Sequence, residues 1–548
     1  MRKLLHTAQR RALLLVAAVL VPVLLFVGCT DLDENTFGTL DQDVLFQSEA
    51  DVQRALAPVY ATMRNFQFGF FNAGEHSTDA TIVPTRGSDW DDGGNWLQLH
   101  QHRWTSTHPE FGGAYGDLLT GVARSNAVLG GLVNNAPEDL NNRAALEAEA
   151  RALRAFFYTL GMDYFGALPV LEEDRFLVDP ENPPSPLDPP GERTNLFNFV
   201  VNELETAVPD LPVDVAEGRF GRGAALMTLA NLYLNAEVYT GTVTESGITP
   251  GTARYEDALD AIESLEDLGL YGPPNSWWDH FAADNLGVQG NIFSIEYLAQ
   301  DGLGYIRHQS NLHYNTVPQG PGATETPWNG FSTLSDYYDN FDDDDLRKDV
   351  FLAGQLYAQP NVSCFGNECF SDENTAQLTE RFDGPPLIIG PIESPTGARE
   401  REGFRPLKWE LDPNQSAENA GNNFVFYRWA EAQLIKAEAL IRLNRVDEGI
   451  QVINDEVRAL VFDPPQPLSM GLSQAAALEA VYDERGFEFV HENKRRADMI
   501  RFDLASGGQP RFLDAWKFKN ESQPFRVLFP IPQSQVDANP NLDQNPGY

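Results

Sequence analysis

Cysteine and lysine are scarce in this sequence. Its 548 residues include three cysteines and seven lysines, whereas Asp and Glu together total 80 and the formal net charge is −41. A chain with this charge repels the phosphates of nucleic acids, so we expect no nucleic-acid partner. The hydrophobic content of 42% is nevertheless ample for a folded core.

Signature motifs of common enzymes are also missing. The sequence contains no G-x-S-x-G, H-E-x-x-H or P-loop motif, and we expect no cofactor and no metal site. The run Asp342–Asp345 offers the hard oxygens that Ca²⁺ prefers, but it lacks the glycine and the terminal glutamate of an EF-hand loop. A helix start is therefore the preferred interpretation of this run.

The first 28 residues have the pattern of a secretion signal. Four basic residues precede an apolar run from Ala12 to Val27, and Gly28-Cys29 follows. This run is shorter than the roughly 20 residues that cross a bilayer comfortably, which makes a signal anchor the less favoured alternative. Because Phe26-Val-Gly-Cys29 resembles a bacterial lipobox, we expect Cys29 to be lipidated and to anchor the chain to a membrane.

The mature chain is expected to begin at Cys29 and to reach the outer membrane. The acidic segment Thr30–Glu34 resembles the signal that sends lipoproteins to the cell surface in Bacteroidetes. Removal of residues 1–28 deletes four positive charges and takes the net charge to −45. In an exported chain, Cys364 and Cys369 are expected to form a small disulfide loop, since two thiols without nearby histidines make a poor zinc site.

Two blocks of the sequence, 43–268 and 425–503, have helical periodicity. The clearest helix is predicted for 147–165, where Leu153, Phe157, Leu160 and Tyr164 recur with the period of one buried face. Further helices are predicted in pairs that resemble tetratricopeptide repeats without a regular 34-residue spacing. The other predicted helices are 43–65, 114–134, 195–208, 224–239, 255–268, 427–443 and 446–460.

The intervening segment, 270–424, has little helical periodicity. It is rich in Gly, Pro, Asn and aromatic residues, and short apolar runs such as Ile292–Tyr297 predict strands. The C-terminal tail from Phe529 is predicted to run extended because proline is frequent in it. No linker divides the chain, so 29–548 is predicted to be one domain.

The stretch 478–502 is predicted to be a charged helix. Glu484, Glu488 and Glu492 follow one another at i+4 and would repel one another by a few tenths of a kcal/mol per pair. We therefore expect counter-charges from arginines in the same stretch, namely Arg485, Arg495 and Arg501. This pattern indicates a helix held by ion pairs at a junction, with a solvated charged face as the alternative.

Several short segments follow one another along the chain in a recognisable order. They are Cys29-Thr-Asp-Leu-Asp33, Ala123-Arg-Ser-Asn-Ala127, Glu147–Ala155, Tyr164–Pro169, Gly223-Ala-Ala-Leu226, Tyr427-Arg-Trp-Ala-Glu431, Lys436-Ala-Glu-Ala439, Glu484-Arg-Gly-Phe-Glu488, Arg495-Arg-Ala-Asp498, Pro530-Ile-Pro532 and Gln544–Tyr548. In this order they resemble the SusD/RagB family of outer-membrane nutrient-binding lipoproteins. The resemblance implies a mostly α-helical fold, with tetratricopeptide-like pairs supporting a loop-rich, minor-β ligand-binding half. It also implies that 478–502 is a structural clasp, which joins the last helix pair to the rest of the protein.

The resemblance also implies a function in nutrient uptake. Members of this family are not enzymes; they capture glycans or other oligomers and pass them to a partner, a SusC-like TonB-dependent transporter. Two alternatives come from other classes: an exported lipoprotein glycoside hydrolase and a helical scaffold that binds peptides. The hydrolase cannot be recognised from sequence because the separation of its two carboxylates is a three-dimensional quantity.

Tryptophans in the two loop regions are the candidate ligand contacts. Sugar rings present C–H faces that lie against aromatic planes, and their hydroxyl groups need amide, carboxylate or guanidinium partners. Tryptophan in a glycine-rich loop is also a common core residue, so each position is a separate hypothesis. The residues expected to bind an oligosaccharide are Arg86, Trp90, Asn95, Trp96, Tyr305, Tyr314, Trp328 and Asn329.

Overall fold

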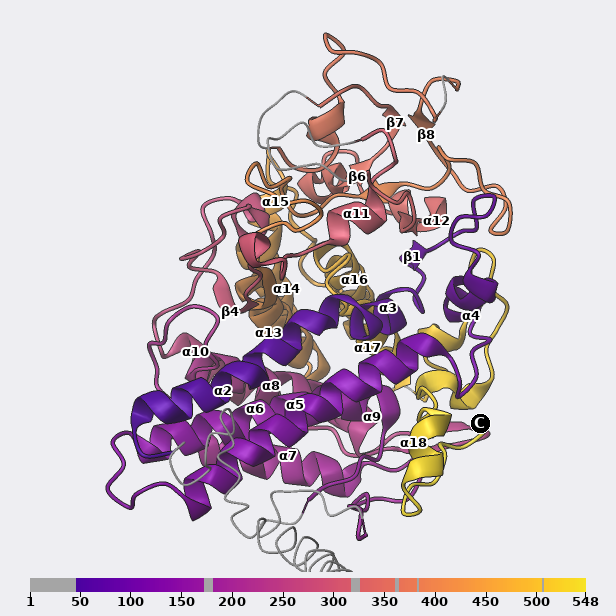
Figure 1. Cartoon of the computed structure of the whole chain (residues 1–548). Helices are drawn as coiled ribbons and strands as arrows, with labels where there is room; N and C mark the ends of the chain where they lie inside the picture. The colour runs from indigo at the N-terminus through magenta and orange to yellow at the C-terminus, as the bar shows by residue number, and fades with distance from the viewer. Residues whose placement is uncertain (1–45, 172–180, 317–325, 360–363, 382–383, 505–506) are drawn as a thin grey trace, which may run out of the picture. The chain divides into compact units, whose positions relative to one another are not determined.

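The computed structural model of the chain describes residues 46–171, 181–316, 326–359, 364–381, 384–504 and 507–548. The predicted signal peptide, Cys29 and the acidic segment after it lie outside the described residues. Residues 46–548 form one compact unit. Helices dominate it, and its strands are short, as the sequence predicted (Figure 1). No helix within the described ranges is long and apolar enough to cross a membrane.

The long helices lie in the two predicted blocks. The helix predicted for 147–165 is confirmed as α6 (Arg143–Phe165); its Leu153 and Phe157 are fully buried, and Gly166 ends it at φ +73°. The first block also contains α2 (Glu49–Met63), α5 (Pro109–Asn134), α7 (Thr194–Ala207), α8 (Arg222–Leu234) and α10 (Tyr255–Glu266). The second contains α13 (Trp429–Arg442), α14 (Val446–Ile453), α16 (Gln474–Glu488) and α17 (Arg495–Arg501).

Neighbouring helices pack in pairs, and several contacts join the two blocks, including those of α13 with α8 and α10 and of α17 with α3 (Gly69–Glu75). Helix α5 packs on α6, α8 on α10 and α13 on α14, and α10 also contacts α13 (Figure 1). Two predicted helices are interrupted. A break at Asn235 separates α8 from α9 (Ala236–Tyr239), and a π-helical turn, Asn454–Arg458, separates α14 from α15 (Ala459–Val461).

The described strands form two-stranded antiparallel sheets, most of which connect distant parts of the chain. The strand predicted for 292–297 is β4 (Asn291–Ile295), which pairs with β10 (Phe424–Arg428). The pair β1 (Thr81–Ile82) and β5 (Ser332–Thr333) ties the first helical block to the loop-rich segment. The remaining pairs are β2 (Thr242–Thr244) with β3 (Gly247–Thr249), β6 (Phe351–Leu352) with β9 (Arg405–Pro406), and β7 (Gly354–Gln355) with β8 (Ile388–Ile389).

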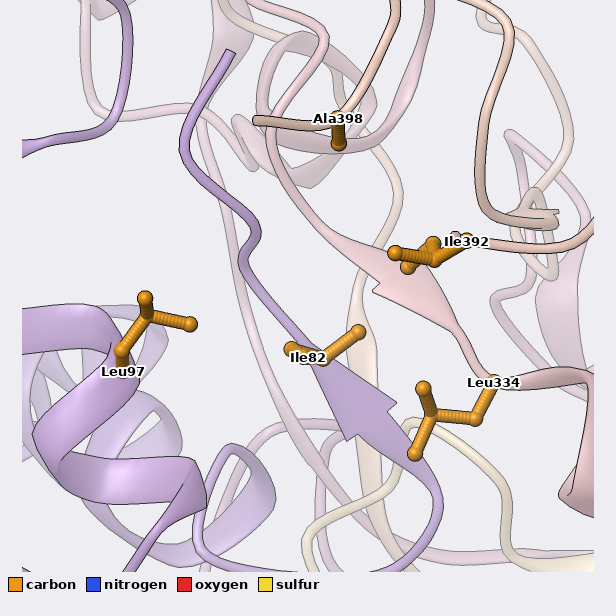
Figure 2. Packing of buried hydrophobic residues seen from close by; sticks show 5 residues of the cluster. All are labelled: Ile82, Leu97, Leu334, Ile392 and Ala398. Carbon is orange, nitrogen blue, oxygen red and sulfur yellow. The ribbon is translucent and has the colours of Figure 1, made fainter. Parts of the chain in front are cut away.

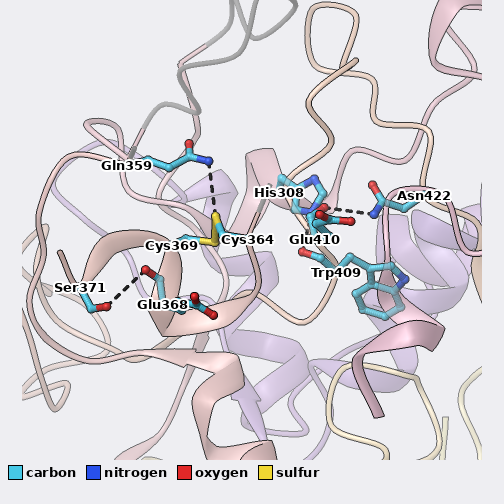
Figure 3. The surroundings of a disulfide bond; sticks show 9 residues. All are labelled: His308, Gln359, Cys364, Glu368, Cys369, Ser371, Trp409, Glu410 and Asn422. Carbon is cyan, nitrogen blue, oxygen red and sulfur yellow. Dashed lines mark hydrogen bonds between the residues drawn. A yellow bond between two sulfur atoms is a disulfide. The ribbon is translucent and has the colours of Figure 1, made fainter. Parts of the chain in front are cut away.

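The loop-rich segment contains short helices and a disulfide. The described helices are α11 (Arg307–Asn311), α12 (Ser335–Tyr338) and several 3₁₀ turns, one of which, Leu346–Val350, is capped by the Asp345 carboxylate. The structure joins Cys364 to Cys369, with their Cα atoms 5.2 Å apart (Figure 3). Gln359 donates a hydrogen bond of 3.4 Å to the sulfur of Cys364, so the disulfide is also held by a residue that precedes it in the chain.

The tail was predicted to be extended throughout, and this prediction is wrong at one place. Helix α18 (Gln533–Ala538) follows Pro532 directly. Proline is tolerated at a helix start because the first helical residues have no intrahelical acceptor for an N–H group. The prediction used the number of prolines, whereas their positions relative to a helix start decide whether a helix can form.

The stretch 478–502 is not one helix, in contrast to the prediction. Helix α16 ends at Glu488 and α17 begins at Arg495, because His491 and Asn493 adopt left-handed φ angles of +61° and +60°. The backbone N–H groups of these two residues donate to the buried carboxylate of Glu75, at 3.1 and 3.0 Å. A partner from α3 (Gly69–Glu75) therefore takes the donors that a continuous helix would use itself.

Three glutamates, two on α16 and Glu492 in the turn after it, are neutralised from elsewhere in the chain. Glu484, Glu488 and Glu492 pair with Arg347, Lys408 and Arg428, and we call these six buried residues the ion-pair cluster. Glu484 also pairs with Arg458. The cations of the cluster come from the loop-rich segment and β10, whereas the sequence had pointed to Arg485, Arg495 and Arg501. Those three arginines pair instead with Asp498, Asp79 and Glu438, respectively. The predicted ion pairs at a junction are thus present, with different partners.

Candidate functional site

The loop Trp328–Phe331 is held by α11. The backbone N–H of Trp328 donates to the carbonyl oxygen of Gln309 at 2.6 Å, and those of Gly330 and Phe331 donate to Ser310 at 2.8 and 2.9 Å. Asn329, with φ +54°, donates to Leu312 at 2.8 Å. Four consecutive backbone bonds therefore fix the loop that carries Trp328.

Two buried arginines hold the same loop from behind. Arg86 donates through Nε to the carbonyl oxygen of Asn329 at 2.8 Å, and Arg405 donates to the Asn329 side-chain oxygen at 2.7 and 3.0 Å. Both arginines also donate to the hydroxyl of Ser332 at 3.0 Å. Burial lowers the pKa of Arg86 to about 10, which leaves it cationic. The hydrogen bonds of Arg86 and Arg405 are therefore made within the protein, and they position the loop Trp328–Phe331.

Trp90 and Trp96 meet this loop from a segment more than 230 residues away. Trp90 has φ +61°, and its indole Nε1 donates to the carbonyl oxygen of Trp328 at 2.7 Å. The ring centroids of Trp90 and Trp96 are 5.4 Å apart, and those of both lie within 5.6 Å of Phe331. A Cβ on Gly330 would stand 2.3 Å from the Trp90 ring, so only glycine permits this contact.

Trp90, Trp96 and Trp328 form what we call the aromatic shelf. Trp328 is 38% exposed, and Trp90 and Trp96 are half-buried. Trp96 lies on α4 (Asn95–His100), and its Nε1 donates to Asp92 at 2.7 Å. Leu97, the next residue of α4, enters a hydrophobic cluster with Ile82, Leu334, Ile392 and Ala398 (Figure 2), whereas Trp90 and Trp96 pack against a second cluster of Phe71, Val83 and Phe331.

Polar and charged groups extend the shelf on one side. The guanidinium of Arg381 stacks over the ring of Tyr314 at 3.5 Å and pairs with Asp89 at 3.1 Å and with Glu400 at 2.7 Å. The Tyr314 hydroxyl donates to Asp89, and burial together with this bond raises the tyrosine's pKa, so it remains a donor at neutral pH. Arg381, Asp89 and Glu400 offer partly exposed cationic and anionic groups beside the shelf, whereas the Tyr314 ring is buried beneath the guanidinium.

The structure brings together most of the residues predicted to bind a ligand, but not all at the surface. Trp90, Trp96, Trp328 and Tyr314 gather at or beside the shelf, and Asn95 starts α4 next to Trp96. Arg86 and Asn329 are buried behind the shelf. Tyr305 lies in the interior, 5.1 Å from the ring of Trp409, with 1% of its surface exposed.

Other tryptophans of the two loop regions have structural positions. Trp104 is buried and donates to the hydroxyl of Tyr548 at 2.8 Å. Trp277 is buried against the ion-pair cluster, where its Nε1 donates to Glu488 at 2.8 Å. Trp278 is half-buried and packs on Phe365, away from the shelf. Residue type alone does not separate these tryptophans from the shelf.

Residues that sequence reasoning missed include Phe331, Arg381 and Glu400. Phe331 lies under the shelf, and Arg381 meets Asp89 across 292 positions of sequence. A local sequence signal exists only for Phe331, which is three residues after Trp328. Across the described ranges, no group of three or more His, Cys, Asp or Glu side chains is placed to hold a metal ion.

Comparison with known proteins identifies the family. The model of the SusD family matches residues 388–548. The SusD-like protein P25 of Formosa agariphila is 34% identical over 549 residues, which cover 96% of this chain and 97% of that protein. The starch-binding protein SusD of Bacteroides thetaiotaomicron is 24% identical over 514 residues, which cover 87% of this chain and 85% of that protein.

A solved structure has the same fold. The surface glycan-binding protein A from Bacteroides thetaiotaomicron, in complex with laminarihexaose, superposes with a TM-score of 0.65 at 19% identity. The superposition covers 91% of this chain and all of that one. With a relative at 34% identity over nearly the whole length, this mostly helical chain belongs to the SusD family.

Proposed function

We propose that this protein is a cell-surface lipoprotein that binds a glycan at the aromatic shelf and delivers it, without catalysis, to a SusC-like TonB-dependent transporter of the outer membrane. The observation that carries the proposal is the shelf itself. The rings of Trp90 and Trp96 meet around Phe331, Trp90 donates to the backbone carbonyl of Trp328 from a distant segment, and the Trp328 side chain is left 38% exposed. Relatives described as binding starch and laminarihexaose support it.

The proposed binding mode follows from the chemistry of the shelf. The faces of Trp90, Trp96 and Trp328 receive the apolar faces of sugar rings, as aromatic side chains do at other interfaces. Asn95 is beside these rings and supplies hydrogen bonds to hydroxyl groups, whereas Tyr314 is buried and its hydroxyl donates to Asp89, so Tyr314 acts by holding that carboxylate. Arg86, Asn329 and Tyr305 act indirectly in this proposal: the first two position the loop, and Tyr305 belongs to the packed interior.

The charges around the shelf favour a neutral glycan over an anionic one. Asp91 and Asp92 are exposed between Trp90 and Trp96, and Asp89 lies beside them. Arg381 is already paired with Asp89 and Glu400, so the nearby cation is neutralised within the protein. Carboxylates at the rim of a site repel uronate and sulfate groups, which adds to the net charge of −41 for the whole chain.

Calorimetry with a panel of neutral and anionic oligosaccharides tests the binding proposal. We expect at least one neutral glycan to bind and Trp328→Ala to weaken its affinity about 10- to 100-fold, as loss of a central aromatic contact does. Trp278→Ala is the matched control, because it removes a half-buried tryptophan outside the shelf. Absence of binding to every glycan, or equal losses in both variants, would contradict the proposal.

The anchor and the transporter are tested separately. Metabolic labelling with a radioactive fatty acid should mark the wild-type chain and leave Cys29→Ser unlabelled. The lipidated protein, extracted in mild detergent, should co-purify with an outer-membrane barrel. A chain labelled regardless of Cys29, or one purified alone after crosslinking in intact cells, would remove this part of the proposal.

The absence of catalysis has its own test. Asp89 and Glu400, two carboxylates beside the shelf, both bind Arg381, and neither is presented as a free acid or nucleophile. Prolonged incubation with the bound glycan should therefore release no shorter sugar. Product release that disappeared in Asp89→Asn or Glu400→Gln would instead identify a glycoside hydrolase.

A further inference from the structure

Helix α11 is entirely polar, yet all five of its residues are buried. Its sequence is Arg307-His-Gln-Ser-Asn311, and it lies directly behind the loop that carries Trp328. Buried polar side chains are normally satisfied by hydrogen bonds, and each exception needs a physical explanation. Arg307 is the exception with the largest consequence, because arginine cannot lose its charge in a protein.

Arg307 has few partners for a buried cation. Its guanidinium stacks over Phe71 at 4.2 Å and over Phe331 at 5.3 Å. One nitrogen, Nη1, donates to Asn72 at 3.1 Å, whereas Nε and Nη2 have no partner within the described part of the chain. No described carboxylate stands within 4.0 Å of it to form an ion pair. A buried charge without a counter-charge costs several kcal/mol.

Arg86 and Arg405 show that this situation is not general for buried arginines of the protein. Neither has an ion-pair partner among the described residues, but all their nitrogens donate to carbonyl, amide or hydroxyl oxygens. Their hydrogen-bonding capacity is therefore used by the protein itself. Arg307 differs because two of its three nitrogens remain open.

Arg307 lines an internal cavity of about 80 Å³. A volume of roughly 10–15 Å³ already holds one water molecule, so this cavity has room for an ion together with water. Its wall includes half-buried residues such as Leu160 and Ala497, which place part of it close to solvent. The cavity lies among α3, α6, α8, β10 and α17 and does not include the tryptophans of the shelf.

Every other charged side chain described on the cavity wall has an ion-pair partner. Glu492 pairs with Arg428 and Lys408, and Asp163 pairs with Arg496. The remaining wall charges form a second set of pairs. These are Arg485 with Asp498, Arg501 with Asp498 and Glu438, and Lys494 with Glu431. Arg307 is thus the charged wall residue, within the described ranges, that has no ion-pair partner, and the carboxylates of Glu110 and Glu75 act on it only from beyond ion-pair distance.

The open polar atoms of the wall are also mostly donors. They are Nε and Nη2 of Arg307, Nη1 of Arg485 and the hydroxyl of Tyr305, which can donate or accept. Water could satisfy the hydrogen bonds but would leave the charge of Arg307 unbalanced in a medium of low dielectric constant. A small anion satisfies both requirements.

We propose that this cavity is a binding site for a monovalent inorganic anion, chloride being the abundant one, held by Arg307 and Tyr305. The site is distinct from the proposed glycan site but adjacent to it, since Phe331 contacts Arg307 on one side and Trp90 and Trp96 on the other. The bound anion neutralises the cation behind the shelf and stabilises the folded state. Binding of the anion at this site does not depend on which glycan binds at the shelf.

Anomalous diffraction from crystals grown in sodium bromide tests the site directly. We expect a bromide peak within hydrogen-bond distance of Nε or Nη2 of Arg307, and no such peak in crystals grown in sodium gluconate. Bromide found only on the protein surface, or density at Arg307 that fits water in both salts, would overturn the proposal. This measurement uses the wild-type protein and does not require any variant to fold.

Thermal unfolding at constant ionic strength gives a second readout. When chloride replaces gluconate, we expect the wild-type midpoint to rise by about 3 °C at a chloride concentration near one hundred times the dissociation constant. Arg307→Met should abolish this rise, whereas Arg193→Met should retain it. Arg193 is a matched buried arginine that donates to the carbonyl oxygens of Met162 and Val238, outside the cavity. Equal midpoints in the two salts, or a rise retained in Arg307→Met, would contradict the proposal.

Discussion

The ion-pair cluster and the aromatic shelf are both built from parts of the chain that are distant in sequence, but the cluster buries its side chains whereas the shelf leaves some of them exposed. In the cluster, Glu488 meets Arg347 and Arg428 across 141 and 60 positions, and all three are buried. At the shelf, Trp90 meets Trp328 across 238 positions, and Trp328 remains 38% exposed. The comparison indicates that charges with every partner inside the protein maintain the fold, whereas rings with open faces are available to a ligand.

Removal of one cluster carboxylate should have the largest effect on stability. Burial alone would raise the pKa of Glu488, but Arg428, Arg347 and Lys408 hold it far below its usual value. Glu488→Gln leaves two buried guanidinium groups short of counter-charge and should lower the free energy of unfolding by about 3–5 kcal/mol. Urea unfolding measures this, and the exposed Glu448→Gln, paired with Arg445 at the surface, should show no change.

Arg485→Ala should have a smaller effect in the same direction. The Arg485 side chain is buried and donates through Nε to Asp498 at 2.9 Å, but Asp498 retains Arg501 as a second partner. We expect a loss of about 2–3 kcal/mol in the free energy of unfolding and unchanged glycan affinity in the folded fraction. The exposed Arg54→Ala is the control. Lost affinity at full stability would show that Arg485 belongs to the binding site.

The pH dependence of the unfolding free energy should differ between His308, on the helix behind the shelf, and the ion-pair cluster. Burial lowers the pKa of His308 on α11 to about 4, so between pH 4 and 6.5 the unfolded state binds a proton that the folded state does not. Stability contributed by this group rises with pH and is lost as pH falls from about 6.5 toward 4, by about 1.4 kcal/mol per pH unit. His308→Gln should reduce the slope of unfolding free energy against pH in this window. An unchanged slope would mean that His308 is already protonated in the folded protein.

The carboxylates of the cluster should behave differently over the same range. Because arginine and lysine partners depress the pKa values of Glu488 and Glu492 against the opposing effect of burial, these groups stay ionised. Their contribution is present above the unfolded pKa and is lost only as pH falls below about 4.5. Glu488→Gln should therefore leave the slope between pH 5 and 6.5 unchanged.

Gly330→Ala should produce the smallest effect and should act on binding. A methyl group at this position would stand 2.3 Å from the Trp90 ring and displace it from Phe331. We expect glycan affinity to fall about tenfold, equivalent to roughly 1.4 kcal/mol, because one of the three rings loses its position. Gly112→Ala, where the added methyl group meets nothing within 4 Å, is the matched control. Equal glycan affinities of Gly330→Ala and the wild type would show that Trp90 does not contact the glycan.

The helical scaffold could be predicted from sequence because its signal is local. The 3.6-residue period of α6 records which face is buried, and its end at Gly166 is visible in the residue type. The break between α16 and α17 had no such signal, since it depends on the Glu75 carboxylate more than 400 positions away. The counter-charges of Glu484, Glu488 and Glu492 were misassigned for the same reason: Arg347 and Lys408 are distant from them in sequence.

The candidate site was predictable in composition and only partly in geometry. Aromatic residues concentrated in two loops indicated the shelf, where Trp90 contacts Trp96 and donates a hydrogen bond to the backbone of Trp328. Arg86 and Asn329 were selected because their side chains can bind sugar hydroxyls, but the structure uses those groups to hold the Trp328 loop. Residue type describes what a side chain can bond to, whereas its burial is decided by contacts that no local pattern records.

A paired measurement on two variants tests the central claim, that stability and binding reside in different regions. Glycan affinity by calorimetry and unfolding free energy in urea are measured for Trp328→Ala and Arg485→Ala against the wild type. We predict that Trp328→Ala loses affinity at nearly unchanged stability and that Arg485→Ala loses stability at unchanged affinity. A Trp328→Ala protein that binds as well as the wild type, or an Arg485→Ala protein that is fully stable but no longer binds, would contradict the account.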